Sequence, residues 1–111
     1  MERTSPYSPP PRRPKIVCLC GSTRFMDAFA QANRDKTLAG EIVLTVAVDF
    51  KTDTTARQED KVRLDELHLR KIDLADYVHI INVGGYIGEG TKREIAYAQG
   101  LHKPVTYLEP L

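Results

Sequence analysis

The 111-residue sequence lacks a charge imbalance and a long apolar segment, and each absence excludes a class of protein. There are 16 basic residues against 15 acidic ones, so a net charge of +1 creates no field that would recruit a nucleic acid polymer or a membrane. No apolar run approaches the roughly 20 residues of a membrane-spanning helix. The N-terminus also lacks the apolar middle region of a secretory signal. We therefore expect one soluble domain with its own core.

Cysteine is equally scarce, with only Cys18 and Cys20 in the chain. Both fall in a predicted strand, where we expect them to point to opposite faces. We therefore expect no disulfide between them, and their spacing is not that of a metal-ligand motif. No other group of cysteine, histidine or carboxylate side chains has ligand spacing, so the sequence predicts neither a metal nor another cofactor. A reducing cytoplasm is the expected location.

The first 14 residues are rich in proline and have no apolar periodicity. This composition predicts an extended or disordered tail over residues 1–14, followed by an ordered domain over residues 15–111. The segment Pro9-Pro10-Pro11-Arg12-Arg13 is of a kind that docks into aromatic grooves, which would make the protein an adaptor. A solvated leader without a partner is the alternative, since such tails are common at termini.

The rest of the chain alternates short apolar runs with stretches of helical periodicity. Strands are predicted over 15–20, 41–48, 77–83 and 104–108, and helices over 25–38, 62–74 and 91–100. A polar stretch over 49–61 predicts a mobile loop. Because strand-helix-strand units cross over right-handed, this alternation predicts a small doubly wound parallel α/β sheet, flavodoxin-like or Rossmann-like. About four strands in the order 2-1-3-4 with three helices are expected.

Loops that follow parallel strands share one edge of the sheet, which is where such folds bind ligands. The first of these loops holds Gly21, Ser22, Thr23 and Arg24 at a helix start. Free amides, two hydroxyls and a guanidinium suit a phosphate or sugar. A glycine turn with a Ser or Thr N-cap and a surface arginine would have the same sequence. The loop matches neither the dinucleotide fingerprint nor the Walker pattern.

A second loop at this edge, Asn82–Thr91, has four glycines within seven residues and leads into the last predicted helix. Thr91 and Glu94 have the spacing of a capping box, in which the glutamate accepts a hydrogen bond from the N-cap amide. At a ligand-binding edge, the same carboxylate could instead act as a base or nucleophile. Glu89 is either a second functional acid or merely solvated. His68, on the inward stripe of its helix, is either a core-edge residue or part of the site.

The chain resembles the nucleoside 2-deoxyribosyltransferase-like superfamily, which includes nucleoside 5′-monophosphate N-glycosidases. The resemblance spans about residues 15–109 and rests on three stretches in the same order. These are Lys15 to Arg24, Ile72 to Asn82, and Gly90 to Ala98, which reads Gly-Thr-Lys-Arg-Glu-Ile-Ala-Tyr-Ala. The last is similar to the family's Gly-Thr-x-x-Glu-x-Gly-x-Ala segment, although Ile95-Ala96 replaces the usual residue-Gly pair after the glutamate.

The resemblance implies that Glu94 is a nucleophile that attacks the anomeric carbon of a ribose or deoxyribose. It implies a 5′-phosphate contact for Ser22, Thr23 and Arg24. Gly88 stands where the family commonly has an Asp or Ser, with Glu89 one position later, and His68 stands where it has an Asp. The further candidates for substrate binding are Gly21, Asn82, Gly88, Gly90 and Thr91.

The expected function is therefore cleavage or transfer of the N-glycosidic bond of a nucleoside or its 5′-monophosphate. Family members usually form homodimers or larger assemblies whose subunits complete each other's sites. A nucleotide-binding or sensing module that uses the same loops without catalysis is the alternative.

Overall fold

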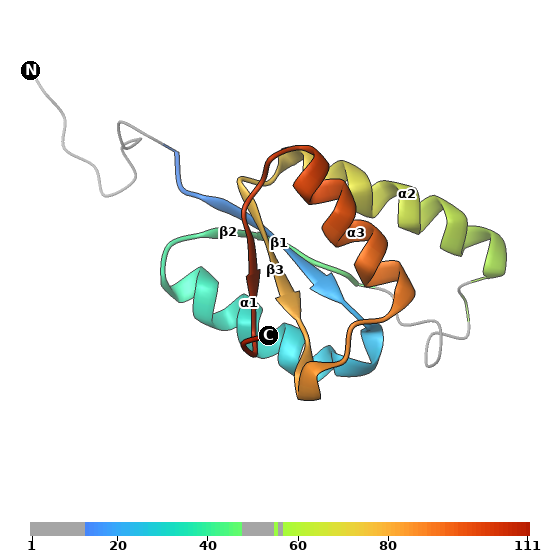
Figure 1. The fold of residues 1–111 in the computed structure, drawn as a ribbon, viewed down its shortest axis with the longest axis horizontal. Helices are drawn as coiled ribbons and strands as arrows, with labels where there is room; N and C mark the ends of the chain where they lie inside the picture. Colours follow the sequence, from blue (N-terminus) through green and yellow to red (C-terminus); the bar gives the residue numbers. More distant parts are fainter. Residues whose placement is uncertain (1–12, 48–54, 56) are drawn as a thin grey trace, which may run out of the picture.

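A computed structural model of the protein describes residues 13–47, 55 and 57–111, and residues 1–12, 48–54 and 56 lie outside the description. The chain folds into one parallel sheet and three α-helices (Figure 1). The strands are β1 (Ile16–Gly21), β2 (Ile42–Leu44), β3 (Tyr77–Ile81) and β4 (Val105–Tyr107). The helices are α1 (Met26–Leu38), α2 (Gln58–Leu74) and α3 (Glu89–Gly100), with short 3₁₀ turns at Thr23–Phe25 and Val83–Gly85.

The strand order is β2-β1-β3-β4 with every pair parallel, which confirms the predicted α/β topology. β1 and β3 occupy the centre and pair over five positions, from Val17 opposite Tyr77 to Gly21 opposite Ile81. Both read as nearly continuous apolar runs because a central parallel strand is covered by helices on both faces. The carboxyl ends of β1 and β3 consequently lie side by side.

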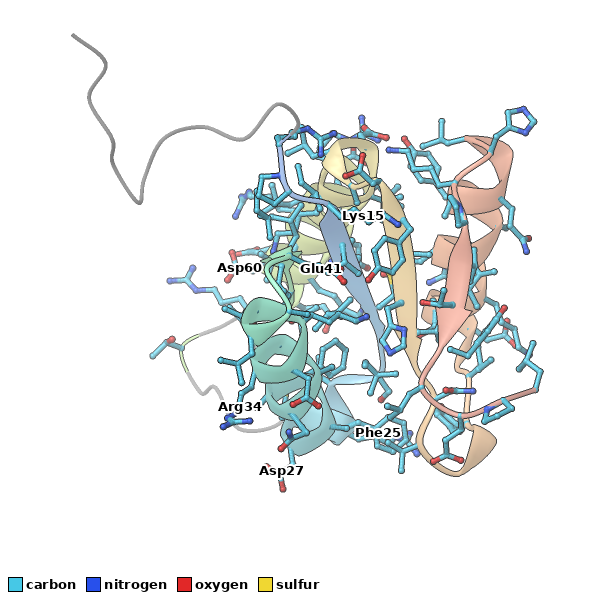
Figure 2. All side chains as sticks on the ribbon, turned by 90° about the vertical axis from the view of Figure 1, so that its left-hand side faces the viewer. Lys15, Phe25, Asp27, Arg34, Glu41 and Asp60 are labelled. Atoms are coloured by element: carbon cyan, nitrogen blue, oxygen red, sulfur yellow. The ribbon has the colours of Figure 1, made fainter. Side chains whose placement is uncertain are left out.

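Two apolar clusters form the core, one on each face of the sheet. On one face Phe29 and Ala32 of α1 pack against Val17, Leu19 and Ile81. On the other face Ile72 of α2 and Ala98 of α3 pack against the remaining inward side chains of β1 and β3, namely Cys18, Cys20, Val78 and Ile80. The outer side of α1 is polar, and Figure 2 shows its Asp27 and Arg34 pointing away from the sheet.

α2 begins four residues before the earlier of its two predicted starts, at Gln58 rather than Val62 or Arg63. The Asp60 carboxylate accepts a hydrogen bond from the backbone N–H of Arg57 at 2.9 Å, which closes the first turn. Residues 58–61, predicted as part of a mobile loop, are therefore helical. The rest of that predicted loop lies outside the described residues, apart from Thr55 and Arg57.

α3 also begins earlier than predicted, at Glu89, with Gly88 in the N-cap position. The N–H of Lys92 donates to the carbonyl of Gly88 at 2.9 Å, which is the first intrahelical bond. Thr91 is consequently the third residue of the helix. The capping-box interpretation of Thr91 and Glu94 is wrong, because Glu94 lies in the second turn.

The first described residues are tied to the amino end of β3. Asp76 accepts hydrogen bonds from the Ile16 amide and from two nitrogens of the Arg13 guanidinium. The Arg13 guanidinium holds the pKa of Asp76 well below its usual range. Most of the predicted proline-rich tail lies outside the described residues.

β2 is shorter than its predicted span, since only Ile42–Leu44 pair with β1. Among the described residues, no helix combines the length and apolar character needed to cross a membrane.

Candidate active site

A cavity of about 450 Å³ opens at the carboxyl edge of the sheet, between the loop after β1, the α2 helix and the start of α3. Most of the predicted site residues line it: Gly21, Ser22, Thr23, His68, Gly88, Glu89, Gly90, Thr91 and Glu94. Segments far apart in the sequence therefore meet here, as parallel-sheet topology requires.

Glu94 faces this cavity from the second turn of α3. Its side chain is 21% exposed, and its Oε2 lies 4.0 Å from Nε2 of His68. Burial raises the pKa of Glu94 above its ordinary value, and the opposing charge of His68 does not cancel that rise. Because Gly88 rather than Thr91 begins the helix, the carboxylate is not committed to a helix cap. It is available to a ligand.

His68 reaches the floor of the cavity from α2 and is almost fully buried. Its Nε2 lies 3.6 Å from Sγ of Cys18 and 3.4 Å from Sγ of Cys20. The expectation that the two cysteines point to opposite faces is wrong, because side chains two apart on a strand lie on the same face. Both thiols are free and buried, and both point toward α2 and α3.

These four side chains form a coupled acid–base cluster. Hydrogen bonding with Cys20 outweighs burial and lowers the pKa of Cys18 to about 5, with His68 adding to the effect. The pKa of Cys20 rises well above its ordinary value, since Cys18 and burial both disfavour a second thiolate. Burial would lower the pKa of His68, but the neighbouring Cys18 and Glu94 outweigh it and raise that pKa. These shifts disfavour ionisation of both thiols together and favour the charged form of His68.

The sequence of the loop after β1 allows either a ligand-binding loop or a capped turn with a surface arginine, and the structure has features of both. Ser22 caps the 3₁₀ turn through a hydrogen bond from the Arg24 amide at 3.3 Å, and it also accepts from Nε of Arg24 at 3.2 Å. Gly21, Ser22 and Thr23 nevertheless line the cavity. Arg24 does not line it, and its guanidinium stacks over the ring of Tyr86, which does, at 4.2 Å.

Two other predicted residues have partners of their own. Asn82 is fully buried, and its side-chain amide exchanges two hydrogen bonds of 2.9 Å with the backbone of Glu109. It does not line the cavity, so it joins the end of β3 to the chain after β4 instead of reaching a ligand. Glu89 is exposed at the cavity rim, with its carboxylate 3.6 Å from Nζ of Lys92.

The cavity also holds polar residues that the sequence did not single out as site residues, namely Lys61, Asp65, Lys71 and Tyr86. The Nζ of Lys71 donates to the Thr45 carbonyl at 2.6 Å. Lys61, Asp65 and Lys71 share one helical stripe with His68, at spacings of three and four, so the period of α2 was the signal that could have found them. Tyr86 follows a glycine pair in a loop, where no periodic pattern in the sequence could indicate that it lines the cavity.

One group of described residues has the ligand types and proximity to hold a metal ion: Cys18, Cys20 and His68, whose ligand atoms all lie within 4.8 Å of one another. The expectation of no ligand cluster rested on spacing along the chain, and it failed because the histidine comes from an element 48 residues beyond Cys20.

No family model matches the sequence, and no curated protein is similar to it at the sequence level. Among solved structures, the chain is similar to the 2-deoxyribosyltransferase of the psychrotolerant bacterium Bacillus psychrosaccharolyticus. The TM-score is 0.63 and the identity 19%, and the match covers 86% of this chain and 76% of the other. The described chain therefore has the fold of a 2-deoxyribosyltransferase.

Proposed function

We propose that this protein cleaves or transfers the N-glycosidic bond of a nucleoside or its 5′-monophosphate, with Glu94 as the nucleophile. The observation that carries the proposal is the position of Glu94, a half-buried carboxylate that lines the cavity without serving as a helix cap. Two further points support it. The solved structure with the same fold is a 2-deoxyribosyltransferase described as a biocatalyst for nucleoside synthesis, and Gly90 to Glu94 has the superfamily's Gly-Thr-x-x-Glu pattern.

In the proposed reaction, a carboxylate oxygen of Glu94 attacks the anomeric carbon of the sugar. The bond from that carbon to the base breaks, and the base leaves with the electron pair and takes up a proton. The glycosyl-enzyme ester is then opened at the same carbon by water, which releases the sugar, or by the nitrogen of a second base, which completes a transfer. Either route returns Glu94 as a carboxylate.

The neighbours of Glu94 supply positioning. We assign the loop amides and hydroxyls of Gly21, Ser22 and Thr23 to the 5′-phosphate or sugar, because they line the same cavity beside a helix start. His68 and Glu89 are the candidates for orienting the sugar hydroxyls or the leaving base. Gly88, Gly90 and Thr91 line the same cavity and are assigned to substrate binding.

The test is release of free base from a panel of nucleosides and nucleoside 5′-monophosphates, followed by chromatography. Glu94→Gln should fold normally and lose activity by about 10³-fold or more, since removal of a nucleophile abolishes the covalent route. Glu66→Gln is the matched control, because Glu66 lies on the exposed side of α2 and forms an ion pair with Arg70 at 3.5 Å. Full activity in folded Glu94→Gln would exclude the nucleophile. Tight nucleotide binding by wild type with no base released would identify a sensing module instead.

We further propose that the protein acts as a homodimer in a reducing cytoplasm. The two buried free thiols fit that compartment. Subunits of the resembled superfamily complete each other's sites.

A further inference from the structure

The buried thiols beneath Glu94 have no role in the proposed glycosyl chemistry. Cys18 and Cys20 are fully buried, on adjacent inward positions of the central strand β1, and His68 of α2 lies over both. Apolar side chains would fill the same space without three coupled polar groups. Two soft sulfur donors and one imidazole are the ligand set that zinc prefers in proteins.

The spacing of these donor atoms agrees with a tetrahedral metal site. Zinc bonds of about 2.3 Å to sulfur and 2.0–2.1 Å to nitrogen, at tetrahedral angles, place the two ligand atoms about 3.5–3.6 Å apart. The Sγ atoms of Cys18 and Cys20 lie 3.6 and 3.4 Å from Nε2 of His68. All three donors fall within 4.8 Å of one another, so a single ion can reach them together.

A fourth ligand and an entry path are also present. The Oε2 of Glu94 lies 4.0 Å from the same His68 nitrogen, so a small movement of its carboxylate reaches the fourth position. His68 and Glu94 both line the cavity, which gives an ion access from solvent to the buried sulfurs. Two thiolates neutralise the charge of a divalent cation.

We propose that Cys18, Cys20 and His68 bind one zinc ion at the floor of the cavity, with Glu94 completing the coordination. Each thiol that is protonated beforehand gives its proton to solvent when the ion binds. A consequence rests on the proposed function: an ion that holds Glu94 removes the nucleophile, so zinc inhibits glycosyl transfer reversibly and a chelator restores it.

The direct test uses tag-free, full-length wild-type protein and cobalt(II) as a spectroscopic probe for the zinc site. A tetrahedral thiolate site gives intense visible ligand-field bands and a thiolate-to-cobalt charge-transfer band, at one equivalent of metal, and added zinc abolishes both. The chain has only two cysteines, so a thiolate band can come from nowhere else. Absence of the band in wild type overturns the proposal without reference to any variant.

Variants assign the ligands. Cys18→Ala with Cys20→Ala, and separately His68→Gln, should each weaken zinc binding by about 100-fold or more, since even outer-shell changes cost 10–100-fold. His102→Gln is the matched control, because His102 is exposed and does not line the cavity, and this variant should bind zinc as wild type does. Equal zinc affinity in the double cysteine variant would overturn the proposal.

Zinc binding and catalysis are separable in these experiments. A cobalt spectrum with no base release from any nucleotide means that the metal site exists and the proposed activity fails. Base release with no cobalt spectrum means that the proposed activity exists and the metal site does not. Glu94→Gln should retain the charge-transfer band, since both sulfurs remain, while it loses base release.

Discussion

His79 lies in the middle of β3, where it faces the layer that contains α1. Its Nδ1 lies 2.7 Å from Oγ1 of Thr106 on the neighbouring strand. Burial lowers the pKa of His79 from 6.5 to about 4, and the positive charge of Lys36 adds to this effect against a smaller contribution from Glu41. The folded protein therefore holds this side chain neutral over a pH range in which the unfolded chain protonates it.

We predict that His79 makes the protein less stable as the pH falls from about 6.5 to about 4. In that window the unfolded state binds a proton that the folded state does not, so the free energy of unfolding decreases. The decrease stays below about 1.4 kcal/mol per unit of pKa difference, because solvent screens the charge at this half-buried side chain. His79→Asn keeps a polar atom near Thr106 and should flatten this decrease. Urea unfolding at a series of pH values measures it.

His102→Asn is the control for that series, since His102 is an exposed histidine in the turn after α3. It should leave the pH dependence of wild type in place. If wild type and His79→Asn lose stability in parallel between these pH values, His79 is not the group responsible.

At the scale of secondary-structure elements, the turn from β1 into the first helix depends on Gly21. Its φ is +156°, and a Cβ added there would lie 2.8 Å from the backbone oxygen of Ile81 on the neighbouring strand. That close approach brings the ends of β1 and β3 together where the cavity opens. The backbone at Gly21 and the backbone at Ile81 cannot move apart without a shift of the central strands β1 and β3.

We predict that Gly21→Ala lowers the free energy of unfolding by about 1–3 kcal/mol, because the added methyl group overlaps a backbone atom. Chemical denaturation measures it. Gly100→Ala at the end of α3 is the matched control, since nothing lies within 4 Å of its added Cβ. That change should be neutral or stabilising by up to about 1 kcal/mol. An equal effect of the two substitutions would show that the contact with Ile81 does not constrain the turn.

The element order was predictable because apolar periodicity alone separates buried strands from amphipathic helices, and parallel topology then fixes the sheet edge. The residues at which α2 and α3 begin could not be predicted in the same way. Asp60 begins α2 by accepting the Arg57 amide within a polar stretch that has no period, and Gly88 begins α3 without any side-chain cap. That two-residue error in α3 is what made Thr91 and Glu94 resemble a capping box.

The candidate site was predictable where its residues follow strands and unpredictable where distant side chains meet. Gly21 ends β1 and Glu94 lies in the helix that follows β3, so topology alone brings them to the same edge. The approach of His68 to the two thiols depends on which turn of α2 packs over β1, and on both cysteines sharing one face of that strand. Arg24 shows the opposite case, since it stacks on the cavity residue Tyr86 and does not itself line the cavity.

At the scale of the whole molecule, α2 has one face that the described chain leaves uncovered. Leu67 and Leu74 are seven residues apart, two helical turns, and are 48% and 65% exposed. Leu67 also lines the cavity, so a surface seated on this face of α2 would extend the wall of the candidate site. A second copy of the chain is the occupant that we expect, in keeping with the proposed homodimer.

We predict that wild type is a dimer in solution by light scattering coupled to gel filtration, and that Leu74→Glu shifts it to monomer. A charge at this position cannot be buried in an apolar interface without a cost of several kcal/mol. Leu74 does not line the cavity, so a fall in base release that accompanies dissociation would mean that the partner completes the site. Leu111→Glu, at an 85% exposed terminal leucine, should remain dimeric and active. A monomeric wild type that is fully active would confine the catalytic unit to one chain, with the exposed leucines of α2 serving no assembly.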